Sequence, residues 1–278
     1  MTDPAGGRRP DDEQLIALID AFCDAVPRQR ARAEEHGPLM LFVPVGPGWP
    51  YYARPGLGPR AQVTGADVRA VRARQRELEI PQSFEWIEQT APELAEAAAG
   101  AGLEVTAHPL LVLAVARPAP ALPAGVSVRV ISPDEPDLGR IIAVPEVAFA
   151  HAGTGVGTAG ATERDKIAAG QDPATLAMLR IRLAAGHSVL AAAFDDEGPL
   201  AAGSCQSAGT VAEVTGVGTL PIARRRGLGA AVTAALAAAA LAAGTRTVFL
   251  SAADDAVARL YEGLGFRRIG TAMIAEPG

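Results

Sequence analysis

The sequence predicts an α/β protein with a mixed, mostly antiparallel sheet flanked by helices, and a second, smaller lobe. Apolar runs with strand periodicity alternate with helical patterns along most of the chain. Three successive runs, Val189–Phe194, Leu200–Ser207 and Val211–Thr219, are joined by short turns, which favours antiparallel pairing. A proline-rich connector divides the chain near its middle.

The composition is typical of a globular protein and not of a nucleic-acid-binding one. The chain has 278 residues and is 49% hydrophobic, which is enough to form the core of two domains or of one large one. Charged residues make up 20% of the chain, the formal net charge is -6, and neither half has an excess of positive charge. We therefore expect no nucleic-acid partner.

Cysteine usage and hydropathy predict a soluble, cytoplasmic protein. Cys23 and Cys205 lie far apart and belong to no Cys/His cluster, so no metal site is expected. The N-terminus is polar and has no apolar signal region. The longest apolar run, Ala230–Ala243, is alanine-rich and short for a bilayer span, so no membrane partner is expected.

The proline-rich connector sets the predicted domain boundaries. Residues 117–125 contain three prolines and a glycine, which gives a stiff, non-helical segment. We expect a disordered N-terminus over residues 1–10, an α/β lobe over 11–117, a linker over 118–125 and a C-terminal domain over 126–278. In the first lobe, Thr64 is expected to cap a helix that runs to Leu78. Strands are expected at Leu39–Val45 and Tyr51–Ala53.

The most informative segment joins a strand to a helix. The strand Val211–Thr219 leads through Pro221 into a glycine- and arginine-rich turn, and the helix Leu228–Ala243 follows directly. Helix N-termini expose unpaired N–H groups with partial positive charge, and glycines allow close backbone approach, so such a turn suits phosphate oxygens. Consecutive arginines are disfavoured at a helix N-terminus by about 0.3–1 kcal/mol each unless an anion binds there. The alternative is a solvated basic turn without a ligand.

Two motifs resemble the GCN5-related N-acetyltransferase (GNAT) family. The turn reads Arg224-x-x-Gly227-x-Gly229 and follows Thr219-Leu220-Pro221, which is similar to the family signature Gln/Arg-x-x-Gly-x-Gly/Ala. The segment from Asp254 to Phe266 resembles Asn-x-x-Ala-x-x-Leu-Tyr-x-x-x-Gly-Phe of the family, with Asp254 in place of Asn. The resemblance covers residues 126–278 and implies a GNAT-type sheet.

The resemblance also implies how acetyl-CoA, the acyl-donor substrate, is bound. The pyrophosphate of coenzyme A is expected on the N–H groups from Arg225 to Ala230. The backbone of Val217–Thr219 is expected to pair with the pantetheine arm, and one N–H there would polarise the thioester carbonyl. The full expected binding set is Val217, Gly218, Thr219, Arg224, Arg225, Arg226, Gly227, Leu228, Gly229, Ala230 and Asp254.

Transfer to an amine needs a base for the ammonium and a proton donor for the leaving thiolate. Tyr261 matches the family tyrosine near the thioester sulfur; the alternative is a packing residue with its hydroxyl at the surface. Glu213 resembles the general-base glutamate of the histone-acetyltransferase branch, and its apolar neighbours would raise its pKa. A solvent-facing or ion-paired glutamate is the alternative, and a water chain could also serve as the base.

Residues 155–160 match Gly-x-Gly-x-x-Gly, the pattern of dinucleotide-binding turns. Such a turn must follow a strand directly, whereas a helical segment and His151–Thr154 precede this one. A flexible substrate loop is the expected role, because the resemblance places it between two helices that line the acceptor site. His151 could contact the acceptor or simply be solvated.

The N-terminal half echoes part of the C-terminal half. Residues 84–116 align with 247–275 at an offset of 163 positions, which places Gly102 on Gly265 and Ala98 on Tyr261. The first lobe is therefore interpreted as a degenerate GNAT-like lobe without the phosphate turn, or alternatively as an unrelated α/β lobe.

The predicted function is N-acetylation of a primary amine on a small-molecule or peptide acceptor. The rival hypothesis is a catalytically silent acyl-CoA sensor or interaction protein, and a weaker one is acyl transfer to a hydroxyl or hydrazine group. The acceptor and the oligomeric state are left open, because acceptor loops diverge freely on one fold.

Overall fold

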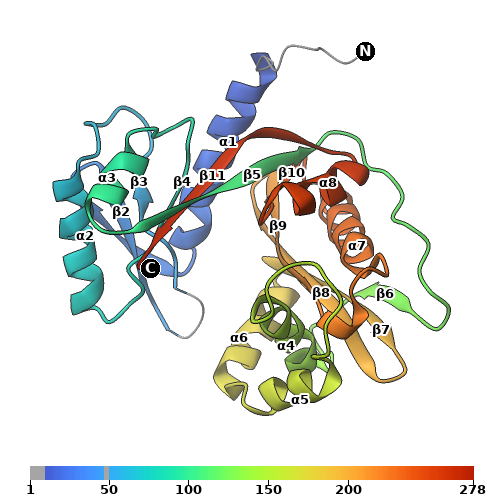
Figure 1. The fold of residues 1–278 in the computed structure, drawn as a ribbon. Coiled ribbons are helices and arrows are strands. Elements are labelled where there is room, and N and C mark those ends of the chain that lie inside the picture. Colours follow the sequence, from blue (N-terminus) through green and yellow to red (C-terminus); the bar gives the residue numbers. More distant parts are fainter. Residues whose placement is uncertain (1–9, 47–49) are drawn as a thin grey trace. The chain divides into compact units, whose positions relative to one another are not determined.

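The computed structural model describes residues 10–46 and 50–278, so residues 1–9 of the predicted disordered N-terminus lie outside it. The chain forms two compact units. The first contains residues up to Leu111 together with Ser251–Ala258 and Arg268–Gly278, and the second contains Val112–Leu250 and Arg259–Arg267. The last strand therefore ends in the first unit (Figure 1).

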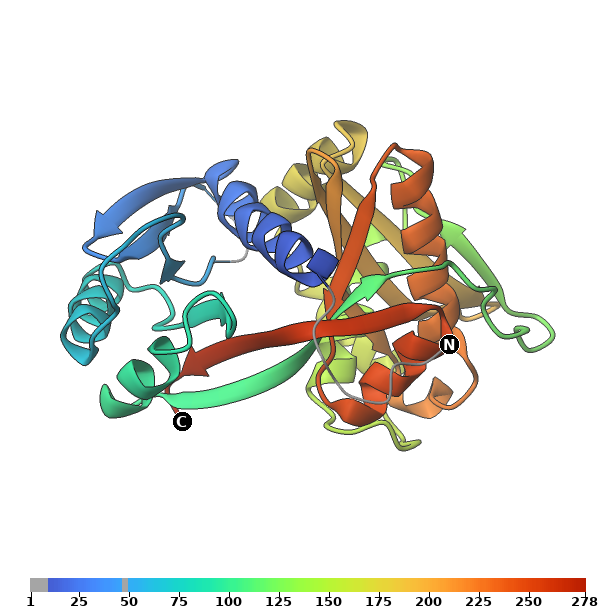
Figure 2. The ribbon, with the colours of Figure 1, turned by 90° about the horizontal axis from the view of Figure 1, so that it is seen from above.

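The elements of the N-terminal half alternate between helices and strands. They are α1 (Pro10–Arg28), β1 (Ala31–His36), β2 (Leu39–Pro44), β3 (Arg54–Pro55), α2 (Gly65–Glu77), β4 (Phe84–Ile87), α3 (Leu94–Gly100) and β5 (Glu104–Leu113). Strands β1, β2 and β3 form a three-stranded sheet, and β4 and β5 flank the last strand, β11 (Phe266–Glu276). Figure 2 shows β5 and β11 side by side.

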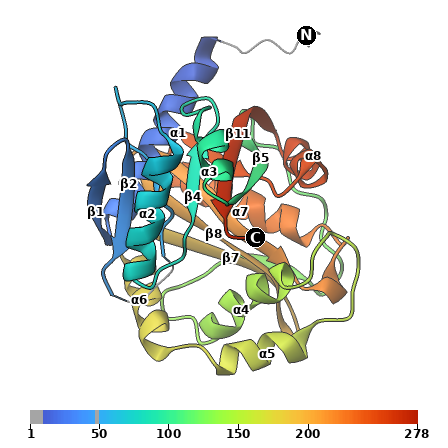
Figure 3. The same ribbon diagram turned by 60° about the vertical axis from the view of Figure 1, so that its left-hand side comes forward.

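Local signals account for these elements. Thr64 caps α2 as predicted, because its side chain accepts from the Asp67 N–H and the Asp67 carboxylate accepts from the Thr64 N–H in return. Helix α2 lies along β1 and β2 (Figure 3). Val68 and Val71 on its inner face join a core that also contains Leu41 of β2.

One expectation for this lobe is wrong, and one strand was not predicted. The strand expected at Tyr51–Ala53 lies one step later, at Arg54–Pro55, and Ala53 forms only an isolated bridge to Phe84. Strand β1 was not expected, because its sequence, ARAEEH, has no strand-like apolar alternation. It forms because every residue from Ala31 to His36 pairs with the apolar strand β2.

The elements of the C-terminal half include the three predicted successive strands and the helix that follows them. They are β6 (Ser127–Val130), α4 (Leu138–Phe149), α5 (Ala161–Ala169), α6 (Pro173–Ala184), β7 (Ser188–Asp195), β8 (Gly198–Ala208), β9 (Val211–Thr219), the 3₁₀ turn η1 (Pro221–Ala223), α7 (Leu228–Ala242), β10 (Thr247–Ser251), α8 (Asp255–Gly263) and β11. The second unit's strands lie in the order β10-β9-β8-β7-β6. Strands β6 to β9 pair antiparallel and β10 pairs parallel to β9, which confirms the predicted mixed, mostly antiparallel sheet.

Helices cover both faces of this sheet, and glycines let them approach it closely. A Cβ atom on Gly203 would lie 3.2 Å from Leu236 of α7. A Cβ atom on Gly218 would lie 2.8 Å from Cα of Pro145 in α4. Val217, which contacts Gly203, and Gly218 are neighbours on one strand, so they face opposite sides of the sheet. Helices α7 and α4 therefore pack on opposite faces of β9 (Figure 1).

The similarity between residues 84–116 and 247–275 is also present in their secondary structure. The elements β4, α3 and β5 repeat the order of β10, α8 and β11. The aligned glycines, Gly102 and Gly265, both adopt positive φ, at 81° and 96°. A Cβ on Gly265 would also collide with the carbonyl oxygen of Val115. The glycine of the Gly-Phe motif is thus required by the backbone.

No helix among residues 10–46 and 50–278 combines the length and apolarity needed to cross a bilayer.

The close approach of α4 to β9 predicts a strong effect of Gly218→Ala. The added methyl group would overlap Pro145 and Ala148 in α4, and overpacking of this kind costs about 1–3 kcal/mol of unfolding free energy. Gly263→Ala is the matched control, because a Cβ there meets no atom within 4 Å. Urea unfolding should show the loss for Gly218→Ala alone, and equal stability of both variants would contradict the packing described.

Candidate functional site

Strand β9 contains an irregularity in its middle. Gly216 has φ 64°, and the register of β8 against β9 shifts between Ala202 and Ser204, so Gly216 and Val217 together oppose Gly203. This is a β-bulge, in which an extra residue bends one strand and increases its twist. A glycine inside an apolar strand is the sequence signal for it.

Pairing of β9 with β10 ends three residues before Gly216. Parallel pairing joins Val211–Glu213 to Thr247–Phe249 and ends there, although β9 continues to Thr219. Residues 214–219 therefore have a strand partner only on the β8 side. The open edge ends at the turn that precedes α7.

The turn presents a row of backbone donors. Arg225 and Gly227 adopt positive φ, at 65° and 76°, and Gly227 is the N-cap of α7. Across the part of the chain that the structure describes, no acceptor pairs with the N–H groups from Arg225 to Ala230. The helix dipole adds partial positive charge at this end. Six adjacent donors in this field have the chemistry that an anion requires.

The two glycines of the turn have different roles. Gly227 needs its positive φ, which costs little without a Cβ. At Gly229 a Cβ would meet Thr219 at 3.4 Å and Val217 at 3.8 Å, which are ordinary contacts. The start of α7 thus packs directly on the end of β9, and Gly229 lies at this contact.

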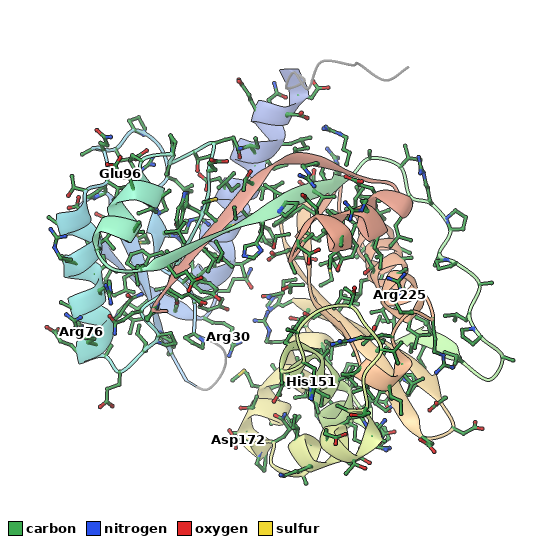
Figure 4. The ribbon with its side chains drawn as sticks, viewed as in Figure 1. Arg30, Arg76, Glu96, His151, Asp172 and Arg225 are labelled. Atoms are coloured by element: carbon green, nitrogen blue, oxygen red, sulfur yellow. The ribbon has the colours of Figure 1, made fainter. Side chains whose placement is uncertain are left out.

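The three arginines of the turn differ in their surroundings. Arg225 and Arg226 are exposed, and Figure 4 labels Arg225. Arg224 is half-buried and hydrogen-bonds to backbone carbonyls instead. Its Nη2 donates to Ala148 O at 2.9 Å and to His151 O at 2.7 Å, and its Nη1 donates to Gly155 O at 3.2 Å. The Arg224 side chain is therefore part of the framework around the turn.

Tyr261 lies against the first turns of α7. Its side chain is buried and hydrogen-bonds with Thr233, whose Oγ1 donates to Gly229 O at 2.9 Å. Burial raises the pKa of Tyr261 to about 12, and the hydrogen bond with Thr233 offsets part of that rise. The tyrosine is therefore protonated at neutral pH and connected through Thr233 to the anion site.

Glu213 occupies the last position at which β9 pairs with β10. It is half-buried, lies opposite Gln206 of β8 and is in register with Phe249. Burial, with a smaller effect from the Glu213 charge, raises the pKa of the neighbouring Cys205 thiol to about 12. Cys205 is thus a protonated core residue at neutral pH.

Asp254 caps a helix. Its Oδ1 accepts from the Val257 N–H at 2.8 Å, at the start of α8. This capping interaction accounts for an Asp or Asn at the first position of the second motif.

The Gly-x-Gly-x-x-Gly segment follows α4, not a strand, and packs on η1. The Gly157 N–H donates to Pro221 O at 3.1 Å, and the Ile222 N–H donates to Ala159 O at 3.1 Å. A Cβ on Gly157 would lie 3.0 Å from Pro221. These glycines let one loop pack closely against another, which is a different role from dinucleotide binding.

A pocket of about 520 Å³ lies between α4 and α5. It is lined by Glu146, Val147, Ala150, His151, Glu163, Lys166, Ile167, Gly170 and Gln171. Glu163 accepts from the Gly160 N–H at 2.7 Å, and this bond lowers the pKa of its carboxyl group. His151 donates through Nδ1 to Val147 O at 2.8 Å, and Figure 4 labels it at the end of α4. Apart from His151, sequence reasoning identified none of these residues, because no local pattern marks them.

Comparison with known proteins bears on the fold. Residues 192–274 match a family described as FR47-like protein. A comparison with curated proteins finds no match to the sequence. A GCN5-related N-acetyltransferase from Kribbella flavida is 24% identical, with 95% of this chain and 96% of that one covered and a TM-score of 0.66. Another from Sphaerobacter thermophilus is 16% identical, with 96% and 94% covered and a TM-score of 0.56.

The chain has the GNAT fold. The predicted resemblance to the GNAT superfamily is thereby confirmed. A tandem GNAT protein from the clavulanic acid biosynthesis pathway is 19% identical, with 86% of this chain and 78% of that one covered and a TM-score of 0.51. This likeness, together with the repeated strand-helix-strand order, supports a second GNAT-like lobe.

Proposed function

We propose that the protein is an N-acetyltransferase that transfers an acetyl group from acetyl-CoA to a primary amine. The observation that carries this proposal is the row of free N–H groups from Arg225 to Ala230 at the start of α7. Those donors suit the pyrophosphate of coenzyme A, and the exposed Arg225 and Arg226 would add positive charge around it. The GNAT fold supports the assignment of the anion as an acyl-CoA.

The open edge of β9 is the proposed site of the pantetheine arm. Its amide groups would pair with the backbone of Val217–Thr219 in the manner of an added strand. An N–H at that edge would also polarise the thioester carbonyl as charge develops on its oxygen. The end of β9–β10 pairing at Glu213 supports this placement, because the following residues of β9 have no strand partner on the β10 side among the described residues.

Tyr261 is the proposed hydrogen-bond donor to the leaving thiolate. A phenol with a pKa of about 12 is a weaker acid than a thiol, whose ordinary pKa is about 8.5. Tyr261 would therefore stabilise the thiolate mainly by donating a hydrogen bond. To do so, its hydroxyl must turn from Thr233 to the sulfur.

Glu213 is the proposed base that accepts the ammonium proton, directly or through water. Its half-buried position at the point where β9 and β10 part supports this role. A base must be deprotonated to act, so the rate should rise with pH through its pKa. Loss of that rising limb in Glu213→Gln supports the role, and an unchanged pH profile excludes it.

The acceptor is proposed to bind in the pocket between α4 and α5. The Glu146 and Glu163 carboxylates in its wall would attract a cationic amine. Screening amines with acetyl-CoA and detection of the free thiol would identify the acceptor. Tight acetyl-CoA binding without turnover of any acceptor would favour the rival role of a silent sensor.

Gly229→Asp should abolish acetyl-CoA binding. A carboxylate on the first turn of α7 would repel the pyrophosphate and occupy its space, so we expect the Kd to rise about 100-fold or more. Gly229→Ala is the matched control, because its Cβ makes only ordinary contacts with Thr219 and Val217, and its Kd should rise less than about tenfold. Calorimetry measures both variants.

The same titration gives the stoichiometry. One acetyl-CoA per chain is expected, because the N-terminal lobe lacks the Arg-x-x-Gly-x-Gly turn. Unchanged affinity in Gly229→Asp, or two sites per chain, would contradict the assignment.

Tyr261→Phe should slow single-turnover acetylation of an identified acceptor by about 10- to 100-fold. It removes the hydroxyl and keeps the ring, although losing the bond to Thr233 should cost about 1 kcal/mol of stability. A Tyr261→Phe variant that turns over as fast as wild type would show that the hydroxyl has a packing role and not a chemical one.

A further inference from the structure

The Arg224 side chain joins three segments of the second unit. Its Nη2 bonds to the end of α4 at Ala148, and the same nitrogen and Nη1 bond to the following loop at His151 and Gly155. Its Nε also donates to Thr219 O, at the end of β9, at 3.4 Å. One side chain thus links the last residue of the open β9 edge to the start of the loop 151–160.

Arginine suits this position for two physical reasons. A guanidinium carries five N–H donors in a rigid plane, whereas a lysine ammonium concentrates its donors at one point. In addition, the carbonyls of Ala148 and His151 lie at the C-terminal end of α4, where the helix dipole favours a cation. The substitution Arg224→Lys would keep the charge, but the ammonium could not reach the same set of carbonyls.

Backbone bonds connect the other end of the loop to the turn. The Gly157 N–H donates to Pro221 O, and the Ile222 N–H donates to Ala159 O. A Cβ on Gly160 would lie 3.1 Å from Ile222, so this glycine lets the loop lie flat on η1. The loop is therefore bonded to residues 219–224 near its start, in its middle and near its end, immediately before the N–H row.

We propose that Arg224 is a positioning residue that couples acyl-CoA binding at the turn to the order of the loop 151–160. This inference rests on the proposed function. An acyl-CoA on the N–H groups of residues 225–230 would fix the turn that begins with Arg224. The fixed guanidinium would then hold Ala148, His151 and Gly155 more firmly.

The coupling has a consequence for the acceptor. The loop begins at His151, which lines the pocket between α4 and α5, and ends at Gly160, which is bonded to Glu163 of the same pocket. Acyl-CoA binding therefore completes the wall against which the acceptor binds. The coupling free energy is reciprocal between the two sites, so an acceptor in the pocket should tighten acyl-CoA binding by the same factor.

Amide hydrogen exchange of the full chain, with and without acetyl-CoA, tests the proposal. In wild type, acetyl-CoA should slow exchange in residues 151–160 as well as in residues 225–230. In Arg224→Lys and Arg224→Gln, exchange of the loop should be about tenfold faster or more, from the loss of charge-assisted hydrogen bonds. Acetyl-CoA should then protect the turn without protecting the loop.

Arg246→Lys is the matched control. Arg246 is exposed beyond the far end of α7, about 22 Å along the helix from the turn. It should behave as wild type in both segments. Exchange in β7 and β8 should be unchanged in every variant, which separates a local effect from loss of stability.

The outcomes also separate this inference from the proposed function. If acetyl-CoA protects neither segment in wild type, the proposed function fails, while the exchange of the unliganded loop still tests whether Arg224 holds it. Wild-type protection of the loop in both Arg224 variants, with or without acetyl-CoA, would overturn the positioning role.

Discussion

Six consecutive backbone N–H groups at the start of α7 lack an acceptor among the residues that the structure describes, and the rest of the site depends on them. Gly227 and Arg225 adopt positive φ at the turn that carries these donors, and Gly229 faces the end of β9. Pairing of β9 with β10 ends before the bulge at Gly216, and the strand edge beyond it leads to the same donors. Tyr261 is connected to them through Thr233 and the carbonyl of Gly229.

Local sequence signals predicted the parts of the fold that depend on local chemistry. The strand Val211–Thr219 occurs with the expected bounds, and the helix expected over Leu228–Ala243 ends one residue earlier, because proline and glycine mark their ends. The anion-binding turn was predictable for the same reason, since arginines next to glycines at a helix N-terminus are disfavoured without an anion. The roles of Tyr261 and Glu213 came from resemblance and stay proposals.

Features that depend on distant partners could not be predicted. Strand β1 forms from a polar sequence because β2 supplies the apolar partner. Arg224 looked like a phosphate ligand, yet its guanidinium bonds to carbonyls about 70 residues earlier in the chain. The pocket between α4 and α5 is likewise assembled by tertiary packing of Glu146 and Glu163, which no sequence period brings together. Glycines 157 and 160 matched a nucleotide motif but serve close loop packing.

The central claim is that the backbone N–H groups before α7 bind the pyrophosphate of coenzyme A. The most direct measurement is a titration of ¹⁵N-glycine-labelled protein with coenzyme A, followed by NMR of the amide signals. The largest shifts of the amide signals are expected at Gly227 and Gly229, where the N–H groups would bond to phosphate oxygens. Smaller shifts are predicted at Gly216 and Gly218, on the bent strand. Shifts confined to the glycines of the N-terminal lobe, with Gly227 and Gly229 unchanged, would contradict this claim.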